Sequence, residues 1–307
     1  MDFVDFTLFD VFSKGGLIYM ILSINNNVVS EKDLIVRLNN NILDIKHKYV
    51  KNVYEPVLIM MYNMCDDSEE LNIEIEYNGL KFKKIIERIK EEKKGELALT
   101  TLFKNDYILF ENFYNYYKSQ GVDHFYMYYN GKLNEKISEY IKKEDVSLIE
   151  WDFRYWNEKS KYEHHAQLGQ IHDAIYKYGK CNYDYMIFND LDEYLFIPEK
   201  KIIDYIRENK EIDTFGFCNI WCNRRDGLKE FGTDILIDKK LGYKNRSKAI
   251  HKLESINTIS IHNGYSYNKK EVKIDLENVM YHFYNLTKNR KMNLRKEKKL
   301  DLDFLLN

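Results

Sequence analysis

The sequence predicts an α/β protein with a small β-rich domain over residues 1–93 and a larger domain over residues 94–307 built on a mostly parallel, Rossmann-like sheet. Two patterns support this prediction. Apolar runs of strand length fill the first third of the chain, and after residue 95 such runs alternate with amphipathic helical patterns. Of the 307 residues, 44% are hydrophobic, so the chain can bury a sizeable core.

The smaller domain is predicted to be a β-sandwich, because strand-like runs are separated by turn-forming asparagines. Asn78-Gly79 is the strongest hairpin signal in the chain, since both residues accept the positive φ angles of a tight turn. The Lys/Glu-rich segment 87–94 is expected to be a short helix or a linker. The expected strands are Leu17–Ile24, Val57–Met61, Leu71–Tyr77 and Leu80–Ile86.

The larger domain is predicted to begin with strands and helices in alternation, which is typical of a parallel sheet. Gly121 and Gly179 follow two of the helical patterns and are expected to end those helices. The basic run 288–299 is expected to form a C-terminal helix. The expected strands are Leu97–Phe103, His124–Tyr129, Val146–Trp151 and Tyr185–Phe188, and the expected helices are Asp106–Gln120, Leu133–Lys142 and His165–Tyr178.

Three acids, Asp190, Asp192 and Glu193, follow the apolar strand Tyr185–Phe188. Acids at the carboxyl end of a parallel strand lie at the rim of the sheet, where open α/β folds bind their ligands. Carboxylate oxygens suit Mg²⁺ or Mn²⁺, so this position favours a metal site over a solvated turn. The same Asp-Leu-Asp tripeptide at residues 301–303 has no apolar strand before it, and we expect no function there.

Composition and motifs exclude several other classes. A net charge of −2 does not favour nucleic acid as a partner. No G-x-G-x-x-G or P-loop pattern supports a dinucleotide or a P-loop nucleotide as a ligand. The four cysteines contain no C-x-x-C pair and are expected to be reduced.

The apolar run Leu17–Ile24 is too short to span a bilayer, so a cytoplasmic location is expected. The basic run 288–299 could instead dock reversibly on an anionic membrane.

Several motifs in order resemble those of the GT-A-fold glycosyltransferases, specifically the family 92 and family 2-like enzymes. Leu102-Phe-Lys-Asn-Asp106 opens the match, and Gly121–Tyr128 and the acidic Phe188–Tyr194 continue it. The resemblance covers roughly residues 96–285. Its further members are Glu111, Gln167, Asp173, Lys248, His262 and Tyr281-His282-Phe283.

The resemblance implies a metal-dependent enzyme that moves a hexose from a nucleoside diphosphate sugar, most simply a UDP-sugar, to a hydroxyl of a glycan or glycoconjugate. It implies Mn²⁺ or Mg²⁺ as the cofactor and inversion at the anomeric carbon, with a carboxylate accepting the acceptor's proton. The alternative is a non-catalytic glycan-binding or scaffolding protein that retains the fold.

The resemblance also implies roles for individual residues. Asp192 is the first candidate for direct metal coordination, Asp190 binds the metal, a metal-bound water or the ribose, and His282 completes the metal shell, with His262 as a weaker candidate. In the alternative reading, His282 is a hydrogen-bonded core residue, and Lys104 and Lys248 are solvated surface lysines. The expected donor-binding residues are Lys104, Asn105, Asp106, Gln167, Asp173, Asp190 and Lys248, with the two lysines contacting phosphate.

Asp226 is the first candidate for the catalytic base, because it follows an expected strand at Phe215–Trp221. Glu193 and Glu230 are its rivals, although Asp226 could simply form a turn and Glu193 could be a solvated acid.

Three positions depart from the family pattern. Asn130 stands where the family usually has an aspartate, Asp106 is a shorter acid suited to helix capping, and Phe283 lacks a tyrosine hydroxyl. Recognition of the nucleoside therefore cannot be carried over at Asn130.

Overall fold

The computed structural model describes residues 1–3, 5–24, 33–51, 57–64, 68–156, 165–224, 235–238, 246–262, 271–283 and 297–300. Its contacts divide the chain into two compact units. Unit 1 contains Met1–Lys93 and Phe153–Asn182, and unit 2 contains Lys94–Asp152 and Tyr183–Asn307. Each unit therefore consists of two separate stretches of sequence.

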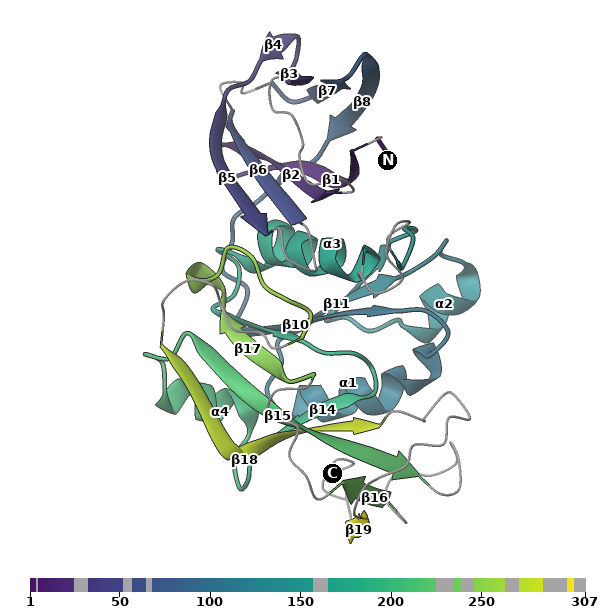
Figure 1. Cartoon of the computed structure of the whole chain (residues 1–307), viewed down its shortest axis with the longest axis vertical. Coiled ribbons are helices and arrows are strands. Elements are labelled where there is room, and N and C mark those ends of the chain that lie inside the picture. The colour runs from purple at the N-terminus through teal and green to yellow at the C-terminus, as the bar shows by residue number, and fades with distance from the viewer. Residues whose placement is uncertain are drawn as a thin grey trace. The chain divides into compact units, whose positions relative to one another are not determined.

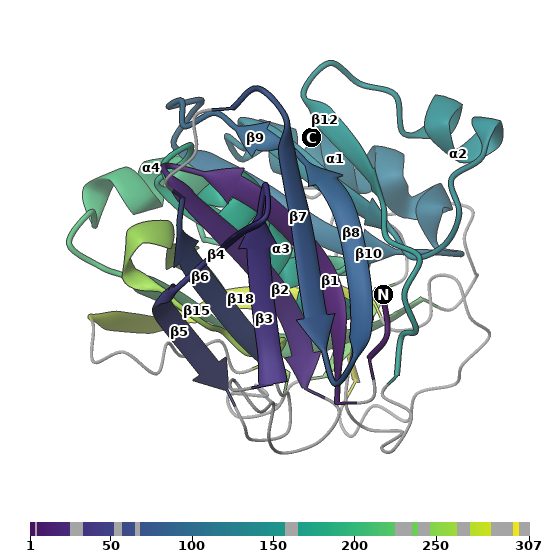
Figure 2. The same cartoon turned by 90° about the horizontal axis from the view of Figure 1, so that it is seen from above.

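Unit 1 contains two β-sheets that share a hydrophobic core, as the sequence predicted for residues 1–93 (Figures 1 and 2). Asn78 and Gly79, with φ angles of 49° and 78°, form the predicted hairpin turn. Apolar residues alternate inward along the strand Leu71–Tyr77, which is the pattern of a strand with one buried face. The first sheet has the order β5 (Ile45–Lys51), β6 (Val57–Asn63), β2 (Leu17–Ile24), β1 (Phe6–Lys14) and β9 (Arg88–Ile89). The second has the order β4 (Asn41–Ile42), β3 (Leu34–Leu38), β7 (Leu71–Tyr77) and β8 (Leu80–Ile86).

The helical segment α3 (Ala166–Asp173) and the π-helix η3 (Ala174–Gly179) belong to unit 1, whereas the sequence placed this helix in the larger domain. The cause is close packing against β1. A Cβ atom on Gly169 would lie 2.5 Å from the Phe9 ring. The buried Lys14 ammonium donates hydrogen bonds to the carbonyls of Tyr176 and Lys177 at the end of η3. These contacts join residues that are 160 or more positions apart, which local sequence patterns do not reveal.

Unit 2 is built on one mixed sheet. The predicted parallel arrangement is confirmed for β12 (Val146–Glu150), β11 (His124–Tyr129), β10 (Leu97–Phe103) and β13 (Tyr185–Phe188). The sheet continues with antiparallel strands β17 (Lys248–Lys252), β15 (Thr214–Arg224), β16 (Ile235–Asp238) and β19 (Glu297–Leu300). The long strand β18 (Val272–Phe283) pairs in parallel with β15 and antiparallel with β14 (Glu193–Phe196).

The helices of unit 2 are shorter than the sequence suggested. The predicted helix 106–120 is a 3-10 turn η2 (Tyr107–Leu109) followed by α1 (Phe110–Ser119). The predicted helix 133–142 is reduced to α2 (Glu135–Tyr140), because Asn134 caps it and accepts a hydrogen bond from the Ile137 amide. The remaining helical segments are α4 (Ile202–Glu208) and the 3-10 turn η4 (Leu253–Ser255).

The predicted C-terminal helix is wrong for the part of it that the structure describes. Residues Glu297–Leu300 form β19, because backbone pairing with β16 replaces the helical hydrogen bonds that Lys and Glu would otherwise favour. The rest of the run 288–299 and the tripeptide 301–303 lie outside the described residues. Among the helices that are described, none is long and apolar enough to cross a membrane.

Candidate active site

The three predicted acids lie in a tight turn between β13 and β14, at the carboxyl end of the parallel half of the sheet. We call residues 189–193 the acid turn. The Glu193 amide donates to the Asp190 carbonyl over 3.0 Å, and the Asp190 amide donates to Glu193 Oε2 over 2.9 Å. These reciprocal bonds fold the chain back on itself.

A buried tyrosine of helix α1 holds the acid turn against the sheet. The Tyr117 hydroxyl donates to the Glu193 carbonyl over 2.8 Å, and it accepts hydrogen bonds from the Leu195 amide and Asn189 Nδ2, each over 3.0 Å. Sequence analysis did not single out Tyr117. It is one of 26 tyrosines, and nothing in its local pattern distinguishes it from the apolar face of α1.

Lys248 on β17 supplies the positive charge inside the acid turn. Its ammonium lies 3.1 Å from Glu193 Oε2 and 3.4 Å from Asp190 Oδ2, and its side chain is only 2% exposed. Burial lowers the pKa of Lys248, but the charges of Asp190 and Glu193 outweigh burial and raise it above its ordinary value. Lys248 is therefore an ion-pair partner of the acids in this structure, and its contact with phosphate stays a prediction.

Glu193 is completely buried, so its predicted alternative as a solvated acid is wrong. Burial is the main cause that raises the pKa of Glu193, the negative charge of Asp190 adds to it, and Lys248 opposes it. Because both Asp190 and Lys248 contact its carboxylate, Glu193 holds the turn together. Both of these contacts are made by Glu193 Oε2.

The other two acids are partly open to solvent. The side chains of Asp190 and Asp192 are 30% and 28% exposed. Burial acts to raise the pKa of Asp190, but the positive charge of Lys248, with contributions from His262 and His282, lowers it overall. Burial and the neighbouring negative charges of Glu193 and Asp190 raise the pKa of Asp192 well above its ordinary value. A positive charge placed beside Asp192 would therefore stabilise its ionised carboxylate.

His282 on β18 faces the acid turn from the neighbouring strand. It pairs with Glu193 in the β14–β18 ladder, and its Nε2 lies 3.8 Å from Asp192 Oδ2. Burial, together with the charges of Lys248 and Arg246, lowers the pKa of His282 to about 3 although Asp190 acts to raise it, so the ring is neutral near pH 7. A neutral imidazole is the form that binds metal ions.

An aromatic stack continues outward from His282. The Trp221 ring on β15 lies 4.4 Å from the His282 ring, centroid to centroid, at an interplanar angle of 29°. The guanidinium carbon of the exposed Arg246 lies 5.6 Å from the Trp221 ring centroid. Neither residue was singled out from the sequence, because Trp221 meets His282 only through pairing of β15 with β18, and Arg246 precedes β17, which pairs with β15 elsewhere along its length.

Of the three predicted residues that follow β10, Asp106 lies near the acid turn. The negative charge of Asp106 contributes to the raised pKa of Asp192. Asp106 Oδ1 accepts a hydrogen bond from the Lys104 amide, and its side chain does not cap η2 as the sequence suggested. Lys104 and Asn105 are exposed beside it.

Other predicted residues lie in unit 1 or outside the described residues. Gln167 and Asp173 lie in unit 1 and are buried, as is every residue of α3. Gln167 Oε1 accepts a hydrogen bond from the Tyr155 hydroxyl. Their donor-binding role stays a prediction. Asp226 and Glu230 lie outside the described residues.

The donor set of the acid turn fits a hard divalent cation in part. Within the described ranges, no three His, Cys, Asp or Glu side chains form a group that could hold a metal ion by themselves. Mg²⁺ and Mn²⁺, however, usually take only one or two protein carboxylates together with substrate phosphates. Asp192 and His282 face each other with an oxygen and a neutral nitrogen, which suits Mn²⁺ in particular.

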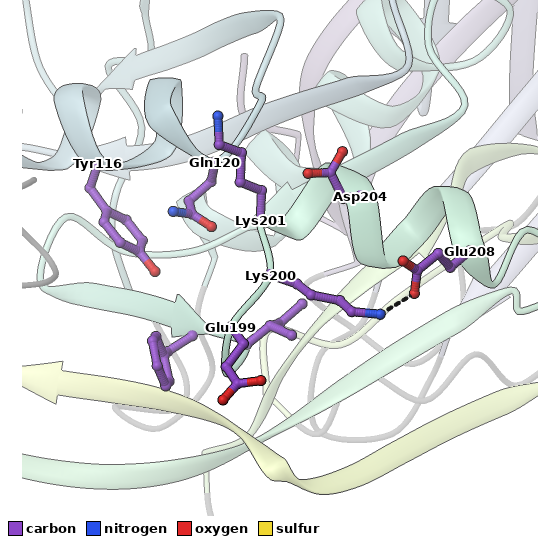
Figure 3. Close-up of a pocket in the computed structure, with 9 residues that line it drawn as sticks. Tyr116, Gln120, Glu199, Lys200, Lys201, Asp204 and Glu208 are labelled. Carbon is purple, nitrogen blue, oxygen red and sulfur yellow. Dashed lines mark hydrogen bonds and ion pairs between the residues drawn. The ribbon is translucent and has the colours of Figure 1, made fainter.

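A separate pocket of about 630 Å³ lies beside helix α4 (Figure 3). The Lys200 ammonium forms an ion pair with Glu208 at its edge. Its described lining residues include none of the acid turn. They are Tyr116, Gln120, Phe196, Ile197, Glu199, Lys200, Lys201, Asp204 and Glu208.

Residues 97–303 match the family model described as Glycosyltransferase family 92. The chain belongs to glycosyltransferase family 92. The match covers most of the chain and all of the acid turn, and it confirms the predicted family and the glycosyltransferase class. A glycosyltransferase requires a sugar donor and an acceptor.

Other comparisons with known proteins add little to the family 92 assignment. Among solved structures, the X-ray structure of the mannosyltransferase Ktr4p from S. cerevisiae is 8% identical to this chain with a TM-score of 0.26. That similarity covers 42% of this chain and 40% of Ktr4p, less than half of either protein, and supports no conclusion about donor or acceptor. A search of curated proteins found no match.

Proposed function

We propose that this family 92 protein transfers a hexose from a nucleoside diphosphate sugar, most simply a UDP-sugar, to a glycan hydroxyl with inversion, in a domain of GT-A type. The observation that carries the proposal is the acid turn. Two partly exposed aspartates face a neutral histidine at the carboxyl end of parallel strands, where α/β proteins bind nucleotides.

Asp192 and His282 are proposed to hold Mn²⁺ or Mg²⁺. Asp190 is proposed to bind the ion, a metal-bound water or the ribose of the donor. When bound, the ion would neutralise the charge that collects on the departing diphosphate. Partial burial and two neighbouring carboxylates destabilise the ionised form of Asp192 without a cation. The same charges give the acid turn affinity for a divalent ion.

The remaining residues are proposed to position the reactants. Glu193 fixes the shape of the turn through its contacts with Lys248 and the Asp190 amide, so we assign it a positioning role. Asp226 stays the proposed base, which accepts the acceptor hydroxyl's proton as that oxygen attacks the anomeric carbon and the diphosphate leaves.

Release of free nucleoside diphosphate from a panel of nucleotide sugars, measured with Mn²⁺ and with excess chelator, tests this function. We expect turnover only with the metal. Asp192→Ala should abolish turnover without unfolding the protein, since a partly exposed carboxylate makes few packing contacts. The matched control is the double variant Asp301→Ala and Asp303→Ala. It removes both carboxylates of the second Asp-Leu-Asp tripeptide and should retain full turnover.

Two outcomes would contradict the proposal. Full turnover in chelator, or an Asp192→Ala protein within a few-fold of the wild type, would remove the metal role. Glycan binding without release of diphosphate from any donor would instead favour the non-catalytic alternative.

A further inference from the structure

The diphosphate of a bound donor needs a cation other than Lys248. The Lys248 ammonium is almost fully buried and contacts both Glu193 and Asp190. Moving it to a phosphate would leave the buried Glu193 carboxylate without its partner, and an unpaired buried charge is strongly unfavourable. Lys248 is therefore committed to the acid turn.

Arg246 is a nearby cation that is open to solvent. It lies two residues before Lys248, and its guanidinium carbon lies 5.6 Å from the centroid of the Trp221 ring, which stacks on His282. His282, at the other end of that stack, faces Asp192 over 3.8 Å. Among the described carboxylates, none forms an ion pair with Arg246. The stack thus leads from the acid turn to an exposed guanidinium.

The geometry of Arg246 suits an anion-binding role. Its guanidinium lies within cation–π distance of Trp221, and contact through the flat face leaves the N–H groups at its edge able to donate. A guanidinium can bind a phosphate group through two parallel hydrogen bonds. The backbone of Arg246 has a φ of 59°, a left-handed conformation that is unfavourable for a residue with a side chain. Such conformations concentrate at ligand-binding sites.

We infer that Arg246 binds the diphosphate of the nucleotide-sugar donor, with Trp221 holding its guanidinium toward the acid turn. The inference rests on the proposed function and adds to it a phosphate contact that the sequence had assigned to Lys248. The metal site and Arg246 would then share the negative charge of the leaving group.

Isothermal titration with UDP and with uridine, in excess chelator and again with Mn²⁺, tests this contact without requiring turnover. Arg246→Gln should weaken UDP binding roughly 10- to 100-fold, the loss typical for a hydrogen bond to a charged group. Uridine binding should not change, because uridine lacks phosphate. Arg246→Lys keeps the charge without the planar fork and should show a smaller loss.

Arg207→Gln is the matched control. Arg207 is an exposed arginine of unit 2 that forms a forked ion pair with Glu96, and its removal should leave UDP binding unchanged. Arg246→Gln with UDP affinity within twofold of the wild type would overturn the inference while leaving the proposed function standing. Equal losses for UDP and uridine would also overturn it, since they would indicate a structural defect. A wild-type protein that binds no UDP in either condition would overturn both.

Discussion

Removal of the buried ammonium by Lys248→Met should be among the most destabilising substitutions in unit 2. The variant keeps the apolar length of the side chain but leaves Glu193, which is completely buried, without the cation that lies 3.1 Å away. Breaking a buried ion pair in this way costs about 3–5 kcal/mol. Chemical unfolding followed by circular dichroism would measure the loss.

Two further variants identify the cause. Adding Glu193→Gln to Lys248→Met removes both charges, so the double variant should recover most of the lost free energy of unfolding. Lys252→Met, on the same strand, breaks the more exposed Lys252–Glu254 pair at 2.9 Å and should cost about 0–1 kcal/mol. If Lys248→Met cost no more than Lys252→Met, the acid turn would not depend on its internal cation, and our account of Glu193 would be refuted.

Two other predictions concern packing and pH. Gly169→Ala should destabilise unit 1 by about 1–3 kcal/mol, because the added methyl would lie 2.5 Å from the Phe9 ring; unchanged thermal stability would contradict the close approach of α3 to β1. Burial lowers the pKa of His251 to about 3. Below pH 6.5 the unfolded chain therefore binds a proton at His251 that the folded chain does not bind. The free energy of unfolding should fall as the pH decreases from 6.5 toward 3. His251→Gln should flatten this pH dependence relative to the wild type, and identical stability–pH curves for the two proteins would show that His251 is not buried as described.

Much of the fold follows from local patterns that the sequence displays. The run Leu97–Phe103 is buried along its whole length, as a central parallel strand must be, and it lies where its apolar residues predicted. The position of the acids is predictable for the same reason, since Asp190 and Asp192 follow a buried strand directly.

The less predictable features depend on contacts between distant residues. The pairing of Lys248 with Glu193 joins strands β17 and β14, and the Trp221–His282 stack joins β15 and β18. A lysine has the same local sequence pattern whether it is solvated or buried, so only the assembled sheet shows that Lys248 is a partner of the acids. The membership of α3 in unit 1 is of the same kind, because it depends on Gly169 meeting Phe9.

The interleaving of the two units along the chain limits how the protein can be recombined with its relatives. Unit 1 is completed only when residues 153–182 have joined residues 1–93, and unit 2 resumes at residue 183. A single crossover near residue 93 would therefore carry only part of unit 1 and separate β1 from its helix. On the ribosome, likewise, the last segment of unit 1 is synthesised after strands β10, β11 and β12 of unit 2. Exchange of an intact unit, in evolution or by engineering, requires both of its segments to move together.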